Sequence, residues 1–196
     1  MGNFIQVYTD GAASGNPGPG AYAAVLQAKN GYKELVHGFR KTTNNRMELW
    51  AVIAALEALK AQQQEVRIYS DSRYVVDAVE KRWLHTWIQN GFKNKKNPDL
   101  WQRFWKVYNQ HKVTLTWVKG HANIPLNERC DQLATKCIKT GPWDIDTVYE
   151  NEIAGSTNKG SSPPPFTLLN NTSPKASPHQ AIIDSSTNPS IRHICT

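Results

Sequence analysis

The sequence predicts an α/β fold in which helices flank a five-stranded mixed sheet, with three antiparallel strands, two parallel additions and the order βββαβαβα. Two observations predict it. Three runs rich in β-branched and aromatic residues come first, separated by glycine-containing turns. Strands and helices then alternate, which is typical of parallel strands joined by helical crossovers.

The first three predicted strands cover residues 3–10, 20–29 and 32–39. The Asn-Gly dipeptide at 30–31 separates the second from the third. Because Asn and Gly accept the positive φ angles of a tight hairpin turn, we expect an antiparallel start to the sheet.

The segment after these strands, residues 44–63, is rich in Ala and Leu and contains no glycine or proline, which favours a helix. An aromatic and basic stretch interrupts the later alternation. The remaining predicted elements are strand 65–71, helix 72–81, helix 98–111, strand 113–120 and helix 127–139.

Composition divides the chain into a folded domain and a tail. We expect residues 1–142 to form one domain, and residues 143–153 to dock on it through Trp143 and Tyr149. Residues 154–196 are dense in Ser, Thr, Asn and Pro, with little apolar periodicity. Such a segment buries too little surface to offset its ordering entropy, so we predict a disordered low-complexity tail.

Charge is distributed unevenly along the chain, whose formal net charge is +7. Residues 1–143 hold 20 Lys and Arg against 11 Asp and Glu, whereas residues 144–196 hold 3 against 5. Within residues 81–112, eight basic residues accompany a single acid, Asp99. This concentration is typical of a surface that binds a polyanion.

Three cysteines, Cys130, Cys137 and Cys195, have no metal-ligand spacing, which favours reduced thiols in a reducing compartment. No run approaches the roughly 18 apolar residues that a membrane helix needs. The N-terminus lacks the basic region and long apolar core of a signal peptide. We therefore expect a cytoplasmic protein with no membrane partner.

The glycine-rich stretch VYTDGAASGNPGPG, residues 7–20, raises the possibility of a loop that cradles phosphate. A dinucleotide-binding loop must lead from a strand into a helix. Here the loop contains Pro17 and Pro19 and leads into another predicted strand, and no GxxxxGK[ST] motif is present. We interpret it as a shaped turn, which leaves Asp10 as the residue of interest.

Four carboxylates stand at or near the ends of predicted elements: Asp10, Glu48, Asp71 and Asp131. Asp10 and Asp71 end two strands, and they converge if those strands are neighbours about 4.8 Å apart. Each acid also has a simpler interpretation. Asp10 could be a turn residue, Asp71 a helix N-cap, Glu48 an exposed helical position and Asp131 an ion-pair partner.

A cluster of the four acids would need a compensating cation, because buried carboxylates repel one another. Oxygen ligands favour a hard ion, Mg²⁺ or Mn²⁺, over zinc.

Four stretches carry a resemblance to a known family: YTDGAASGNPGPGAYA, TTNNRMELWAVIAALEALK, IYSDSRYV and VKGHANIPLNERCDQLA. They resemble the successive motifs of bacterial-type ribonuclease H (type 1), in order and at the family's spacing, over about residues 3–142. The resemblance implies a ribonuclease H-like fold and a Mg²⁺-dependent endonuclease that hydrolyses the RNA strand of RNA–DNA hybrids. The products would carry 5′-phosphate and 3′-hydroxyl ends.

The resemblance also assigns the site residues. The metal-binding acids fall on Asp10, Glu48, Asp71 and Asp131. A loop histidine is usually a surface residue, but the resemblance gives His121 a part in proton transfer or product release. The substrate contacts that we predict are Asn16, Lys41, Thr43, Asn44, Asn45, Arg73, Trp83, Thr86, Trp87, Lys93, Lys95 and Lys96.

These contacts fall into two groups with different expected partners. Polar residues near the acids would read the RNA strand, whose 2′-hydroxyl distinguishes it from DNA. Thr43 or Asn44 could alternatively act only as a helix N-cap. A basic protrusion, about residues 81–103, would hold the phosphates of the DNA strand.

The tryptophans of the protrusion have two interpretations. Trp83 and Trp87 lie four residues apart, on one face of a helix, where they could pack on deoxyribose or into the core. Trp101 and Trp105 are interpreted as core residues.

The chain departs from the family's pattern at four positions, none of them among the four acids. Arg73 stands where relatives carry a polar residue that contacts bases, and Thr86 replaces an asparagine of the phosphate pocket. Asn123 and Ile124 follow the Gly-His-Ala sequence, where relatives often have glycine and a second histidine.

Three other functions fit the sequence less well. Intact acids argue against an inactive hybrid-binding protein. The TTNNRMEL helix and the basic protrusion fit ribonuclease H better than a transposase or integrase relative. The start at Met1 favours a standalone enzyme over a domain of a reverse transcriptase. We expect a monomer without an obligate protein partner.

Overall fold

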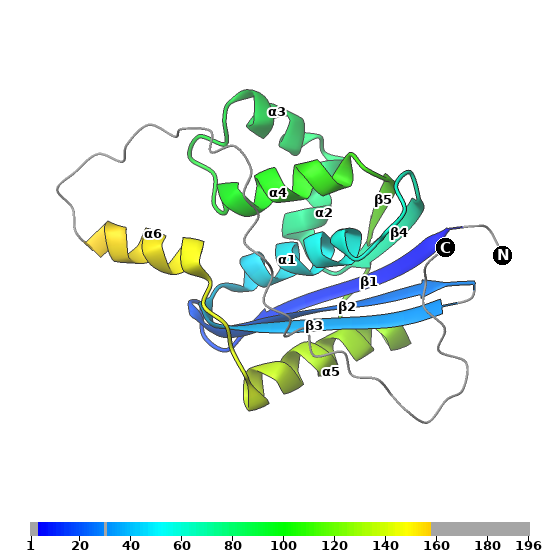
Figure 1. Ribbon diagram of the computed structural model, residues 1–196, viewed down its shortest axis with the longest axis horizontal. Coiled ribbons are helices and arrows are strands. Elements are labelled where there is room, and N and C mark those ends of the chain that lie inside the picture. Colours follow the sequence, from blue (N-terminus) through cyan, green and yellow to red (C-terminus); the bar gives the residue numbers. More distant parts are fainter. Residues whose placement is uncertain (1–3, 30, 158–196) are drawn as a thin grey trace.

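The computed structural model of the protein describes residues 4–29 and 31–157. A single five-stranded sheet, in the order β3-β2-β1-β4-β5, runs through this part of the chain (Figure 1). β1 pairs antiparallel with β2, and β2 with β3, whereas β4 lies parallel to β1 and β5 parallel to β4. The predicted mixed sheet is confirmed. The strands are β1 (Ile5–Ala13), β2 (Gly18–Ala28), β3 (Gly31–Thr42), β4 (Glu65–Ser70) and β5 (Lys112–Trp117).

Helices cover both faces of the sheet, with α1 and α4 on one side and α5 on the other (Figure 1). The sequence explains why α1 packs against the sheet, because this helix is apolar over most of its surface and buries eight of its residues. The helices are α1 (Asn44–Glu57), α2 (Arg73–Glu80), α3 (Trp83–Gln89), α4 (Pro98–Tyr108), α5 (Pro125–Thr140) and α6 (Thr147–Thr157).

Two apolar cores lie on opposite faces of the sheet. The larger one joins the sheet to α1 and α4 and contains Trp101, which is fully buried, as the sequence predicted. The smaller one joins β2 to α5 and includes Cys130. Both Cys130 and Cys137 are free thiols, and Cys130 is fully buried.

Several element boundaries differ from those that the sequence predicted. The helix predicted over 44–63 ends at Glu57, with Ala58 as its C-cap, because residues 60–64 (Lys-Ala-Gln-Gln-Gln) are mostly polar and offer no apolar face to bury. The aromatic and basic stretch between α2 and α4 contains α3, which places Trp83 and Trp87 on a helix as expected, although its bounds were not predicted. The pairing of β1 with β2 extends to Ala13 and Gly20, so the glycine-rich loop is a short turn.

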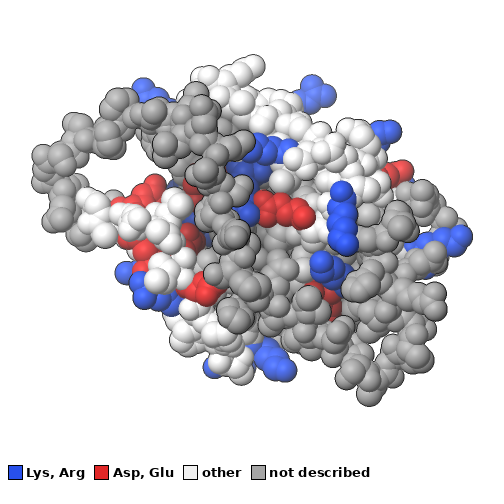
Figure 2. Space-filling view, viewed as in Figure 1, with Lys and Arg blue, Asp and Glu red and all other residues white. Residues whose placement is uncertain are grey.

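The segment after α5 returns to the edge of the sheet. Asp144 forms an isolated parallel bridge with Phe39, through backbone hydrogen bonds to Gly38 and from Arg40. Helix α6 follows and is attached by an ion pair between Arg40 and Glu150 at 2.7 Å. In Figure 2, acidic and basic side chains lie next to one another around α6.

Two predictions fall partly outside the described residues. α6 continues to Thr157, so the first four residues of the predicted tail are helical, and the rest of that tail, 158–196, is not described. Asn30 of the predicted hairpin is not described either, although Ala28 pairs with Gly31 beside it. Within the described ranges, no helix is long and apolar enough to cross a membrane.

Candidate active site

Asp10 and Asp71 lie side by side because β1 and β4 are neighbouring parallel strands. The register pairs Thr9 with Ser70, and each aspartate is the next residue along its chain. Asp10 is half-buried, and its Oδ1 accepts a hydrogen bond of 2.7 Å from the backbone N–H of Gly11. The condition that the sequence left open, that the two strands be neighbours, is therefore met.

Glu48 reaches the same place because α1 packs directly on the backbone of β1. A Cβ atom on Gly11 would overlap the backbone of Met47 and Glu48, so only glycine allows this approach. Thr43 is the N-cap of α1 and accepts from the backbone N–H of Arg46, which decides between Thr43 and Asn44 for that role. Glu48 then lies on the second turn, facing β1.

Two side chains hold the Glu48 carboxylate. Asn44 Nδ2 donates to Oε1 at 2.8 Å, and the Ser72 hydroxyl donates to Oε2 at 2.5 Å. The same Ser72 oxygen accepts from the backbone N–H of Val75, so Ser72 caps α2. The alternative interpretation of Asp71 as that N-cap is thus wrong. Sequence reasoning missed the role of Ser72, although a serine at the start of a predicted helix is itself a capping signal.

Asp71 is held from the other side by the end of β5. Trp117 Nε1 donates to the backbone carbonyl of Asp71 at 3.0 Å. A Cβ atom on Gly120 would lie 2.7 Å from Asp71 Oδ2, so the loop after β5 passes close beside the carboxylate.

Asp131 and His121 complete the group from α5 and from the loop before it. Asp131 is half-buried on α5, where the Thr135 hydroxyl donates to Oδ1 at 3.4 Å. His121 is exposed, with a left-handed backbone at φ +52°. Asn123 in the same loop is left-handed too, at φ +57°.

The electrostatics of the acids reflect their proximity. Burial raises the pKa of Asp10 to about 6, and the negative charges of Asp71 and Asp131 contribute to the rise, whereas His121 lowers it. Burial likewise raises the pKa of Glu48 to about 7, together with the charges of Asp71 and Asp10. Asp10 therefore lies within electrostatic range of the other three predicted acids and of His121.

The donor set fits a hard divalent cation by its chemistry. All four acids offer oxygen, and a cation would offset both the burial and the mutual repulsion that raise the pKa values of Asp10 and Glu48. Within residues 4–29 and 31–157, no three Asp, Glu, His or Cys side chains lie close enough together to hold a metal ion without rearrangement.

The polar residues predicted to contact RNA lie around the start of α1. Asn16, in the exposed turn between β1 and β2, accepts a hydrogen bond from the backbone N–H of Asn44 at 3.3 Å. Lys41 is exposed, and Asn45 is half-buried. This hydrogen bond joins the turn between β1 and β2 to the start of α1, near Glu48.

The residues predicted to contact DNA lie mostly on the exposed surface of the protrusion. Trp83 is 45% exposed, with the Lys81 ammonium 4.9 Å from its ring centroid. Trp87 instead packs edge-on against Trp101 at 5.3 Å, so it is partly a core residue. Thr86, Lys93, Lys95 and Lys96 are all exposed.

Arg73, the departure nearest the acids, is exposed and stacks on Trp117 with its guanidinium carbon 3.7 Å from the ring centroid. It also pairs with Asp77 at 3.5 Å. The guanidinium is therefore held beside the indole that fixes Asp71.

Comparison with known proteins agrees with this geometry. The RNase H family description matches residues 3–139. This chain belongs to the ribonuclease H family. Members of the ribonuclease H family are hydrolases that act as endoribonucleases, and the chain is an enzyme of this class.

Individual relatives extend over most of the chain. It is 56% identical over 147 residues to a ribonuclease H of Desulforamulus reducens, which covers 72% of this chain and 92% of the relative. It is 45% identical over 154 residues to a ribonuclease H of Escherichia coli, covering 76% and 97%.

Solved structures of ribonucleases H share the fold. LC9-RNase H1, a type 1 RNase H with the type 2 active-site motif, has a TM-score of 0.65 at 32% identity, covering 78% of this chain and 81% of that one. LC11-RNase H1, in complex with an RNA/DNA hybrid, has a TM-score of 0.53 at 28% identity, covering 69% and 96%.

Proposed function

We propose that this protein hydrolyses the RNA strand of RNA–DNA hybrids with the help of two Mg²⁺ ions, for which Mn²⁺ can substitute. The cleavage leaves 5′-phosphate and 3′-hydroxyl ends. The convergence of Asp10, Glu48, Asp71 and Asp131 from four separate elements is the observation that carries the proposal. The ribonuclease H relatives and the solved complex of LC11-RNase H1 with a hybrid support the choice of substrate.

The four acids would hold the metal ions. When bound, these ions lower the pKa of the attacking water and stabilise the charge on the leaving oxygen. Asp10, on the central strand of the sheet and in electrostatic range of both Asp71 and Asp131, would hold a metal ion together with these neighbours.

Two residues serve protons and water in this proposal. Glu48 is kept in one orientation by Asn44 and Ser72, and it orients the attacking water. His121 lies on an exposed loop within electrostatic range of Asp10, so it can deliver a proton or assist product release.

The substrate spans the acids and the protrusion. Asn16, Thr43, Asn44 and Asn45 carry donors and acceptors suited to sugar hydroxyls, which only the RNA strand has at the 2′ position. The exposed lysines of the protrusion attract the phosphates of the DNA strand. One chain supplies every residue of the proposed site, so a monomer suffices.

The test is cleavage of a labelled RNA–DNA hybrid with and without Mg²⁺, by the wild type and by Asp10→Asn. The matched control is Glu65→Gln, which removes an exposed carboxylate at the start of β4. Duplex RNA and duplex DNA serve as substrate controls. We expect metal-dependent loss of the RNA strand by the wild type and the control, and none by Asp10→Asn. Binding of the hybrid without cleavage by the wild type would refute the proposal.

A further inference from the structure

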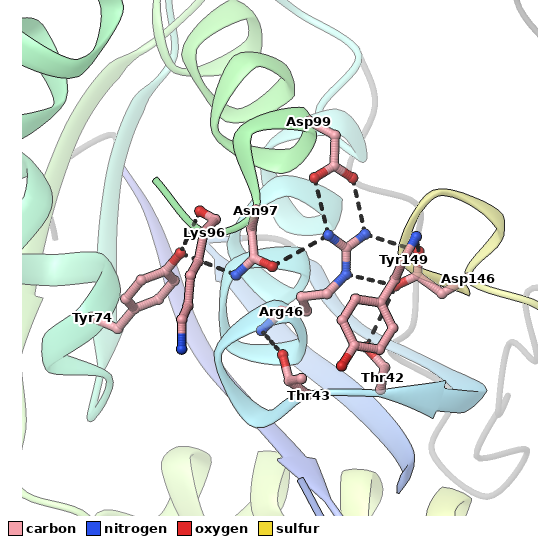
Figure 3. A network of polar contacts seen from close by, with 9 residues as sticks. All are labelled: Thr42, Thr43, Arg46, Tyr74, Lys96, Asn97, Asp99, Asp146 and Tyr149. Carbon is pink, nitrogen blue, oxygen red and sulfur yellow. Dashed lines mark hydrogen bonds and ion pairs between the residues drawn. The ribbon is translucent and has the colours of Figure 1, made fainter. Parts of the chain in front are cut away.

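Arg46 is a fully buried guanidinium at the centre of a polar network (Figure 3). It pairs with two carboxylates, Asp99 at 2.9 Å and Asp146 at 2.8 Å. A further bond, of 3.3 Å, goes to the side-chain oxygen of Asn97. With both carboxylates bound at two points, all five N–H donors of Arg46 have acceptors. Removing one acceptor therefore leaves at least one buried N–H donor of Arg46 without a partner.

The network joins three parts of the chain that are far apart in sequence. Arg46 lies in the first turns of α1, two residues before Glu48. Asn97 and Asp99 begin α4, within the basic protrusion. Asp146 comes from the segment that precedes α6. The C-terminal segment thus contacts the protrusion through a side chain of the helix that carries Glu48.

The protrusion residues that Arg46 contacts are held firmly on their other side as well. Asn97 has a left-handed backbone at φ +58°. Its Nδ2 donates to the Tyr74 hydroxyl at 3.1 Å, and that hydroxyl donates to the backbone carbonyl of Lys96 at 3.2 Å. We call residues 96–99 the protrusion root. Because Lys93, Lys95 and Lys96 lie at or just before this root, its position determines where their charges point.

We propose that Arg46 and Asp146 are positioning residues for substrate binding: together they hold the protrusion root so that its lysines meet the DNA-strand phosphates of the hybrid. The inference rests on the proposed function, because it assumes that the protrusion binds a hybrid. It gives the segment after α5 a function in substrate binding, although this segment contributes no residue to the acid cluster.

The expected consequence follows from the geometry. Without the Asp146 charge, Arg46 is left with buried donors that lack partners, and it shifts toward Asp99 or toward water. A loosened root lets the lysines sample more orientations, so the hybrid must order them on binding. Glu48 is held separately by Asn44 and Ser72, so the chemical step is unaffected.

The experiment measures the Kd for a labelled hybrid in EDTA, and KM and kcat in Mg²⁺. The main variant is Asp146→Asn, which keeps a side chain able to cap α6 through Tyr149 but removes the charge. Asp99→Asn removes the charge of the other carboxylate that pairs with Arg46, the one that belongs to the protrusion. The matched control is Glu150→Gln, which breaks the exposed pair of α6 with Arg40 and leaves the network intact. Circular dichroism checks that each variant is folded.

A double-mutant cycle separates positioning from stability. The second arm is the triple variant Lys93→Ala, Lys95→Ala, Lys96→Ala, with and without Asp146→Asn. We expect Asp146→Asn and Asp99→Asn each to raise Kd and KM at least about threefold at unchanged kcat, and Asp146→Asn to add nothing in the triple variant. Glu150→Gln should match the wild type.

Three outcomes would overturn the inference alone: an unchanged Kd for both network variants, an equal rise in Kd with and without the lysines, or a loss confined to kcat. The network would then serve only the stability of the fold. A wild-type protein that does not bind the hybrid would overturn the proposed function and the inference together.

Discussion

Asp10 illustrates how position in the fold changes the properties of one carboxyl group. It shares a crowded, half-buried place with Asp71 and Asp131, and its pKa rises from the ordinary value of 3.8 to about 6. The rise means that the folded, metal-free protein is strained by this charge at neutral pH. In the proposed function, a bound cation would offset this unfavourable charge.

The first prediction concerns this strain. Between pH 4 and 6 the native state binds more protons than the unfolded state, so stability falls as pH rises through this window. Since one pKa unit corresponds to about 1.4 kcal/mol, Asp10→Asn should stabilise the metal-free protein at pH 7 by on the order of 1–3 kcal/mol. The gain should vanish below pH 4. Urea unfolding in EDTA across this range measures it, and a variant less stable than the wild type at pH 7 would contradict the expectation.

The second prediction concerns His121. It lies on an exposed loop and is proposed to deliver a proton or assist product release, so we expect His121→Ala to slow cleavage on the order of 10²-fold without abolishing it. Single-turnover rates on the hybrid measure the effect. Asn123→Ala, two residues further along the same loop, is the control, and equal losses in both variants would point to loop conformation instead of proton transfer.

At the scale of elements, the site depends on how closely α1 approaches β1. The approach is possible only because Gly11 has no side chain, and it brings Glu48 to the part of β1 that carries Asp10. The protrusion is a different kind of element, since its lysines are exposed and its structural residues, such as Trp101, are buried.

The third prediction tests this close approach. Gly11→Ala places a methyl group against the backbone of α1, where no flexible side chain can move away, so we expect a loss of about 3 kcal/mol or more in the free energy of unfolding. Gly155→Ala in α6 is the control, because nothing lies within 4 Å of its Cβ position. There we expect a gain of about 0.5–1 kcal/mol from helix propensity. Both values come from urea unfolding.

The fourth prediction concerns the lysines of the protrusion. Replacing Lys93, Lys95 and Lys96 with alanine should weaken hybrid binding and lower the slope of log Kd against log salt by up to about 3, since each lysine that neutralises a phosphate adds nearly one to that slope. Binding titrations from about 50 to about 300 mM salt measure the slope. An unchanged slope would show that these lysines do not bind phosphates.

At the scale of the whole molecule, the segment after α5 closes the fold across the edge of β3. It adds a backbone bridge at Phe39 and one member of the Arg46 network. Arg46 has no exposure to water, so its charge depends on both carboxylates.

The fifth prediction separates this segment from the tail. Ending the chain after Ile153 should leave cleavage unchanged, since Asp146 and Glu150 remain in place. Ending it after Gly141 removes Asp146 and should cost about 3–5 kcal/mol, the range for breaking a buried pair. Thermal unfolding and cleavage of both truncated proteins measure the outcomes, and loss of activity in the longer one would contradict the prediction.

Much of the fold could be predicted because it depends on local patterns. Alternating apolar strands, the Ala-rich helix and the turn residues indicate five strands and the main helices without knowledge of distant contacts. The spacing of Trp83 and Trp87 indicated a helix there, but the bounds of α3 could not be predicted, because its aromatic residues are divided between the surface and the core.

The sequence by itself determined the order of the five strands, singled out the four acids as candidate metal ligands, and showed the concentration of positive charge between residues 81 and 112. Only the tertiary structure decided that β1 and β4 are neighbours, that Ser72 holds Glu48, and that Arg46 joins α4 to the segment before α6. The reason is physical: propensity and capping act over a few residues, whereas each of these interactions joins residues distant in the chain and forms only when the whole domain packs.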